Sequence, residues 1–250
     1  MKRLLIGLSL LTVGGLPVFA WGELDGGVGM EYFSVQAYTR DHDGRYFQTL
    51  VQSTLAKARV RYTAAGFFGQ VTGGLNDWQS SGEWGGTVNY VDDRYLWVWQ
   101  QQFSADLGYE FNRWQMGLSY GDHDLQNYYG NTARVFYRLR TTEAFLNFIA
   151  YENSSTRIVL GGGYAFKTAI ELYENGYFAE DNGDITPYEV NSAGEGRRWR
   201  GRVALQYRDS ANWGIDVLYD AGWAQFFDPS NLSEISLRFG SLTGFFVLWF

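Results

Sequence analysis

Hydrophobic and polar residues alternate along much of the chain with the two-residue period of a β-strand. The pattern is clearest over residues 95–111, where one face carries Tyr95, Trp97, Trp99, Phe103, Ala105, Leu107, Tyr109 and Phe111. The opposite face carries Gln100, Gln102, Ser104, Asp106 and Glu110. Residues 113–121 repeat the alternation after a tight turn at Asn112. The two segments are therefore predicted to form an antiparallel hairpin with one apolar and one polar face.

The same period predicts ten strands. They cover residues 27–40, 48–62, 65–75, 94–111, 113–121, 132–151, 156–175, 196–208, 213–223 and 234–250. Short connections near residues 63, 112, 153–155 and 210–212 alternate with longer loops at 41–47, 76–93, 122–131, 176–195 and 224–233. Short turns at one end and long loops at the other are typical of bacterial outer-membrane barrels.

The segment 132–151 leaves the strand number open. Its apolar residues change parity, from Val135, Tyr137 and Leu139 to Ala144, Leu146 and Phe148. A β-bulge within one strand would explain the change and keep ten strands. An extra hairpin there and another near Gly176 would give twelve. We predict ten strands, with twelve as the alternative.

Composition indicates which face of the sheet is outside. Aromatic residues make up 18% of the chain, and beyond residue 20 no run of about 18 apolar residues could form a spanning helix. The apolar face of each strand is the more aromatic one, and the sequence offers no second sheet to cover it. The predicted fold class is all-β, a transmembrane antiparallel β-barrel with an apolar outside and a polar inside.

The N-terminus predicts export. Lys2 and Arg3 precede an apolar run over residues 4–13, and the smaller residues Val18 and Ala20 suit signal-peptide cleavage. We expect residues 1–20 to be a signal peptide and 21–250 to be the barrel. Loss of two cations and no acid takes the net charge from −7 to −9. The chain has no cysteine, which excludes a disulfide framework and a lipid-anchored start. The expected location is the bacterial outer membrane.

The C-terminus predicts two kinds of partner. Leu248 and the final Phe250 resemble the assembly signal of outer-membrane proteins, which implies recognition by the barrel-assembly machinery. Outer-membrane lipid and lipopolysaccharide are the expected surroundings of the barrel. Nucleic acid is not an expected partner, because the mature chain is acidic and its cations fall on predicted inward positions. The sequence predicts neither a cofactor nor a metal site.

Arginines are concentrated on positions predicted to face the lumen. They are Arg134, Arg138, Arg198, Arg200 and Arg202. Inward acids such as Asp106, Glu110, Asp216 and Asp220 could pair with them and fill the interior. The alternative is a basic constriction that selects small anions.

One motif resembles a known family. Residues 73–78, Gly-Gly-Leu-Asn-Asp-Trp, end the third predicted strand, and this rim is similar to that of the omptin outer-membrane proteases, which have ten strands and an acidic pair before a tryptophan. Asp77 matches the second acid of the pair, whereas Leu75 stands where the first would be. The family also needs an Asp-x-His pair on the fourth outer loop, and residues 176–195 contain no histidine. The resemblance implies a related scaffold more than the proteolytic activity.

Two histidines, His42 and His123, lie between acids in predicted outer loops. A histidine beside carboxylates can act as a general base, but a solvated polar loop is the simpler interpretation. If the chain is an enzyme, an omptin-like endopeptidase is the expected class. Its catalytic candidates are then Asp77, Asp122 and His123, since the second and third outer loops are neighbours at the rim.

Aromatic residues deep in the predicted outer loops suggest a binding surface. Trp84, Tyr128 and Tyr129 are rigid faces among short polar neighbours, which suits contact with carbohydrate or protein. The leading hypothesis is a surface-binding or structural role through the outer loops. The alternatives are a small anion-selective pore and an omptin-like hydrolase with an incomplete catalytic set.

Overall fold

In the computed structural model the chain forms a closed antiparallel barrel of ten strands over the described residues, which are 22–40, 46–86, 96–129, 133–179, 185–229 and 233–250. Only the backbone is described for residues 39, 46–51, 77–86, 96–98, 127–129, 133–136, 174–179, 185–192 and 233. Across all the described residues, no helix is long and apolar enough to cross a membrane. The prediction of ten strands is confirmed, and the twelve-strand alternative is wrong.

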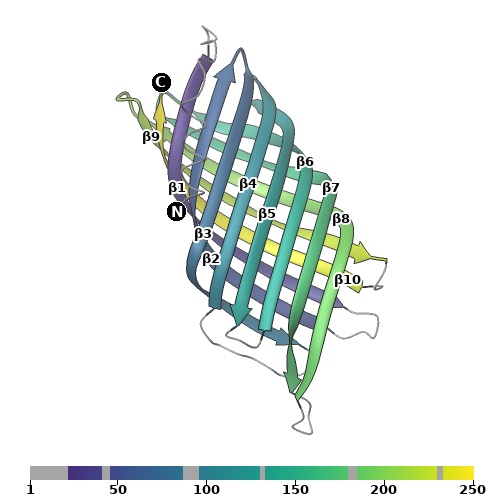
Figure 1. The fold of residues 1–250 in the computed structure, drawn as a ribbon. Helices are drawn as coiled ribbons and strands as arrows, with labels where there is room; N and C mark the ends of the chain where they lie inside the picture. The colour runs from purple at the N-terminus through teal and green to yellow at the C-terminus, as the bar shows by residue number, and fades with distance from the viewer. Residues whose placement is uncertain (1–21, 41–45, 87–95, 130–132, 180–184, 230–232) are drawn as a thin grey trace, which may run out of the picture.

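Each strand pairs with its neighbours in sequence, and the last strand closes the barrel against the first (Figure 1). The strands are β1 (Gly22–Arg40), β2 (Tyr46–Ala64), β3 (Phe67–Gly86), β4 (Leu96–Phe111), β5 (Trp114–Tyr129), β6 (Ala133–Glu152), β7 (Thr156–Ala179), β8 (Ile185–Arg208), β9 (Trp213–Asp228) and β10 (Ser233–Trp249). Gly26 of β1 lies opposite Leu248 of β10. Closure leaves no unpaired sheet edge.

Four short connections lie at the same end of the barrel as Gly22 and Trp249, and we call this the turn end. Three of the turns place non-glycine residues at positive φ, Ala65 at 50°, Asn112 at 54° and Asn212 at 64°. Asparagine tolerates this left-handed conformation, and the neighbouring Gly66, at φ 83°, adopts it without strain. We call the opposite end the loop end.

The strands continue further toward the loop end than the sequence predicted. Strand β3 reaches Gly86, β5 reaches Tyr129, and β7 and β8 are the longest strands, with 24 residues each. Six residues expected in outer loops therefore lie in strands, and the prediction for them is wrong: Asp77, Trp84, Asp122, His123, Tyr128 and Tyr129. Apolar and polar residues stop alternating cleanly in this part of the chain, so the pattern did not report the strands.

Toward the turn end, the outer face of the barrel carries an apolar belt. Its exposed aliphatic residues include Val28, Met30, Val71, Leu107, Met116, Leu118, Leu160, Val203, Leu205, Val217 and Leu242. Aromatic residues border the belt toward the loop end at Tyr32, Phe103, Tyr120, Phe166, Trp199 and Trp223, and toward the turn end at Phe67, Phe111, Trp114, Tyr151 and Tyr207. An apolar band between two aromatic girdles is the outer surface expected of a membrane-spanning barrel.

Toward the loop end, the interior is apolar instead. A cluster that we call the apolar plug joins seven strands and consists of Phe33, Val35, Leu55, Leu125, Tyr137, Leu139, Ile170, Leu172, Ala224, Phe226, Ile235 and Leu237. Leu55, Leu125 and Ile170 are almost completely buried. Beyond the belt most of the described outward side chains are polar, among them Gln101, Asp122 and Arg138. Apolar side chains there gain by turning inward, as they do in a soluble barrel.

This exchange of polarity explains the parity change in residues 132–151. Strand β6 keeps its odd-numbered residues inside, from Tyr137 to Ile149. Its outward residues lie in the apolar belt toward the turn end and beyond the belt toward the loop end. Arg138 consequently lies on the outer face, which corrects its predicted place in the lumen. The register between β6 and β7 is irregular at two places: at Thr142 and Glu143, opposite a bulge of β7 between Ala165 and Thr168, and between Ile149 and Tyr151 of β6 itself. Neither irregularity moves the odd-numbered residues from Tyr137 to Ile149 out of the lumen.

Candidate functional site

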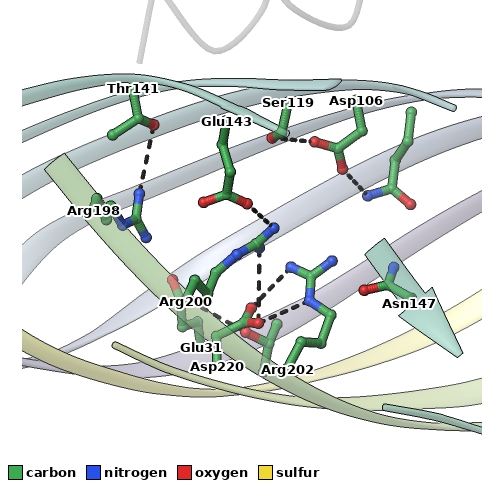
Figure 2. Close-up of polar contacts among 12 residues, drawn as sticks. Glu31, Asp106, Ser119, Thr141, Glu143, Asn147, Arg198, Arg200, Arg202 and Asp220 are labelled. Carbon is green, nitrogen blue, oxygen red and sulfur yellow. Dashed lines mark hydrogen bonds and ion pairs between the residues drawn. The ribbon is translucent and has the colours of Figure 1, made fainter. Parts of the chain in front are cut away.

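The middle of the lumen is built on a row of three arginines. Arg198, Arg200 and Arg202 occupy alternate positions of β8, so their side chains all enter the interior (Figure 2). Arg202 makes a bidentate contact with Asp220, with Nε–Oδ1 at 2.8 Å and Nη2–Oδ2 at 2.9 Å. Arg200 donates to Glu143 and lies 3.8 Å from Asp220 Oδ1. Two of the three predicted lumen arginines in this row are therefore held by carboxylates.

Other charged side chains complete this middle layer. Lys57 Nζ lies 2.6 Å from Glu31 Oε2. Asp106 accepts hydrogen bonds from Gln70 Nε2 at 3.1 Å and from Ser119 Oγ at 2.5 Å. Charges taken out of water are tolerated when other charges and hydrogen bonds satisfy them. The layer is thus a network that fills the barrel and holds neighbouring strands together.

A second ionic layer lies closer to the turn end. Asp216 is completely buried and accepts from Arg59 Nη2 at 2.6 Å and from Arg208 Nη2 at 3.1 Å. Arg59 also lies 3.4 Å from Asp25. On the other side of the barrel, Arg157 lies 3.0 Å from Glu110 Oε2. The guanidinium groups of Arg59, Arg157 and Arg208 are therefore also matched by carboxylates, whereas Arg61 Cζ lies 4.6 Å from the centre of the Phe68 ring.

A cavity of about 160 Å³ lies within the lumen. Phe33, Tyr137 and Leu139 of the apolar plug line it together with charged residues of the middle layer. A barrel of eight strands is filled by side chains, whereas wide aqueous channels need about sixteen. This ten-stranded interior has room for a small ion with water, but the plug and the ionic layers occupy the path along the barrel axis.

The structure does not bring the predicted catalytic residues together. His123 points into the lumen, where its Nε2 lies 2.5 Å from Gln100 Nε2 and 3.3 Å from Gln102 Nε2. Asp122 lies on the outer face and accepts a bidentate contact from Arg138, at 3.2 and 2.8 Å. Adjacent residues of a strand point to opposite faces, so the two cannot act on one substrate. The side chain of Asp77 is not described; its backbone pairs with Trp99.

The surroundings of His123 are those of a packed residue. Its ring meets Phe33 edge-on at 4.8 Å and Tyr137 at 5.4 Å between centroids. Gln100, which contacts it, also accepts from Ser53. In the part of the chain that the structure describes, no three His, Asp or Glu residues form a group that could hold a metal ion. The network thus joins the apolar plug to the charged layer below it.

For some of the remaining predicted residues the structure gives only the backbone pairing, and for the two C-terminal residues it gives the exposure of the side chain. Arg134 and Tyr128 are paired across β5 and β6, next to Tyr129, and Trp84 is paired with Thr49. Their side chains lie outside the described part of the structure. Leu248 and Phe250 are exposed at the turn end, and the amide of Phe250 donates to the carbonyl of Leu24 at 2.9 Å.

Sequence reasoning missed the apolar plug and the network around His123. The plug had a signal, because Ile235 and Leu237, like Phe33 and Val35, already alternate with polar residues near the loop end. In β10, the apolar residues near the loop end have odd numbers (Ile235 and Leu237), whereas those near the turn end include Phe246 and Leu248 with even numbers. This difference shows that the apolar face of the strand changes sides. A count of apolar residues within each strand could not reveal this change.

Comparison with known proteins supports the fold. No protein-family model and no curated protein sequence matches the chain. Among solved structures, the outer membrane protease OmpT from Escherichia coli matches with a TM-score of 0.65 at 10% identity, over 91% of this chain and 97% of that one. Neisserial surface protein A matches with a TM-score of 0.37 at 11% identity, over 91% and 96% of the two chains. Ail of Yersinia pestis gives 0.36 at 12%, over 91% and 99%. The chain therefore has the fold of a ten-stranded outer-membrane β-barrel, similar to that of an omptin.

Proposed function

We propose that the protein is a closed barrel of the bacterial outer membrane that binds a surface ligand through its loop end. In this proposal the apolar belt anchors the barrel in lipid, and the lumen is a structural support. The loop end faces outward, because bacterial barrels keep their short turns on the periplasmic side. The barrel-assembly machinery would recognise Leu248 and Phe250 during insertion.

The filled lumen is the observation that carries this proposal. Solute entering from the loop end would meet the apolar plug, in which Leu55, Leu125 and Leu237 are almost completely buried. Below it, Arg200 and Arg202 are held by Glu143 and Asp220. A transport filter needs binding groups free to exchange partners with the permeant ion. Because the interior is filled, we assign the binding function to the surface of the barrel at the loop end.

The long strands support a role at the loop end. Strands β7 and β8 are the longest and form the hairpin that extends furthest in Figure 1. The tips of β3 and β5 carry Trp84, Tyr128 and Tyr129. Aromatic residues provide large, rigid contact areas and dominate the energetics of many interfaces. These positions are thus our candidates for ligand contact.

The border of the belt supports contact with lipid headgroups. Lys167 and Arg197 are exposed on adjacent strands and lie next to the aromatic residues Phe166 and Trp199. Arg140 is close to them on β6, where it pairs with Glu171 at 3.3 Å. Cations at this level suit the phosphates of lipopolysaccharide. Lipopolysaccharide is therefore the lipid partner that we propose.

Binding to an array of bacterial glycans, host glycans and extracellular proteins tests the surface role. We expect the folded, detergent-solubilised barrel to bind at least one component, and Trp84→Ala or Tyr128→Ala to weaken that binding about tenfold or more, the usual effect of losing an aromatic anchor. Trp114→Ala, at the turn end of the belt, is the matched control and should bind as the wild type does. No binding to the array, or equal loss in the Trp114→Ala control, would argue against this role.

A further inference from the structure

Arg198 is an arginine of the middle layer that has no carboxylate partner. Within the described part of the chain, no carboxylate oxygen lies within 4.0 Å of its guanidinium. Its Nη1 lies 3.5 Å from the hydroxyl of Thr141, its Cζ lies 4.2 Å above the ring of Phe239, and its Nε has no hydrogen-bond partner. Figure 2 shows Arg198 at one side of the cluster, apart from the carboxylates that hold Arg200 and Arg202.

The acids around it are engaged elsewhere. Glu143, which interacts with Arg198 electrostatically, makes its direct contact with Arg200. Glu31 contacts Lys57, and Asp220 makes a bidentate contact with Arg202. The described side chains thus leave the Arg198 end of the layer without a negative partner in contact.

The charge of Lys57, which lines the same cavity, is already offset by Glu31, whose Oε2 lies 2.6 Å from Nζ. Asp106 is held by hydrogen bonds from Gln70 and Ser119. A guanidinium stays protonated at any physiological pH, and an unpaired charge inside a barrel is costly. The arrangement calls for a counter-ion next to Arg198.

We propose that the lumen cavity binds one small oxyanion at Arg198, either a carboxylate or inorganic phosphate. The planar fork of the guanidinium matches both chemistries, because it can donate two parallel hydrogen bonds to a pair of oxygens. The hydroxyl of Thr141 and the phenol of Tyr137 line the same cavity and can act as further donors. The volume of about 160 Å³ admits an ion of this size and excludes a lipid headgroup with its sugars. This site does not depend on the proposed surface role.

Isothermal titration of the refolded full barrel with sodium phosphate and, separately, with sodium acetate tests the site. The titrations are run in chloride-free buffer at constant ionic strength. We expect saturable binding of at least one anion at one site per barrel, weakened tenfold or more by Arg198→Gln. Thr141→Asp should also weaken it tenfold or more, because the new carboxylate can pair with Arg198 within the protein. Arg138→Gln, which alters an arginine of the outer face, should leave the affinity unchanged.

Comparison of the two anions identifies the class of ligand, and comparison of the two lumen variants tests whether the ligand binds at Arg198. Phosphate binding without acetate binding would identify a phosphate site, and the reverse a carboxylate site. If Arg198→Gln does not refold, the Thr141→Asp variant decides alone. Absence of saturable binding by both anions to the folded wild type would overturn the proposal, as would an affinity that is unchanged in either lumen variant.

Discussion

Replacement of Asp216 by alanine is expected to lower the free energy of unfolding by about 3–5 kcal/mol, the usual cost of breaking a buried ion pair. The side chain of Asp216 is 0% exposed and contacts both Arg59 and Arg208. Its removal leaves two guanidinium groups facing each other inside the barrel without their shared carboxylate. Urea unfolding of the barrel in lipid vesicles, followed by tryptophan fluorescence, measures the change.

Asp122→Ala is the matched control for this experiment. Asp122 makes a similar bidentate contact with Arg138, but on the outer face, where both side chains are partly exposed to solvent. Loss of an exposed pair costs at most about 1 kcal/mol. A loss in the Asp216 variant no larger than that in the Asp122 variant would contradict the buried ionic layer.

Leu107→Arg is expected to destabilise the membrane-inserted barrel by about 2–4 kcal/mol, the cost of a cation at the middle of the bilayer. Leu107 is 71% exposed on the outer face of β4. It lies four residues from Phe103, at the loop-end border of the belt, and four residues from Phe111, at the turn-end border. The position is therefore central in the belt, and the same unfolding assay in vesicles measures the effect.

Gln101→Arg, six residues away on the same face of the same strand, controls for the introduced charge. Gln101 is exposed beyond Phe103 and is paired with Asp124 on β5, so an arginine there should change stability by no more than about 0.5 kcal/mol. Equal destabilisation by both substitutions would mean that the bilayer extends beyond the aromatic residues at the loop-end border of the belt. No effect of Leu107→Arg would mean that the belt does not face lipid.

The strand segments at the level of the apolar belt could be predicted from sequence because one rule, the alternation of outward apolar and inward polar residues, governs them. There every strand has lipid on one side and polar side chains on the other, so alternation reports both the strand and its facing. Residues 103–111 and 114–120 follow this rule, and their predicted outward faces agree with the exposed residues of the structure. Closure of ten strands then follows from the order of the segments along the chain.

The loop end could not be predicted in the same way, because the rule reverses there. Tyr137 and Leu139 were expected outside and form part of the plug, while Arg138 was expected inside and contacts Asp122 outside. Nothing in a local window distinguishes an apolar residue that faces lipid from one that faces a protein interior. The reversal becomes visible only when facing is followed continuously along a strand such as β6.

The internal pairs could be predicted as a class but not one by one. An interior filled by arginines and acids was expected, and Arg202 with Asp220 fits that expectation. The partner of Arg200 is Glu143, 57 positions away, and that of Arg59 is Asp216, 157 positions away. Such pairs depend on strand register and on which side chains reach across the lumen, and the sequence pattern contains neither.

Single-channel conductance of refolded residues 21–250 in a planar bilayer tests the central claim that the lumen is closed. The measurement uses anion and cation gradients on protein shown to be folded. The filled interior predicts silence, both in the wild type and when Arg198, Arg200 and Arg202 are each neutralised. Stable openings that are selective for anions and decline in those variants would contradict the account and make the arginine row a transport filter.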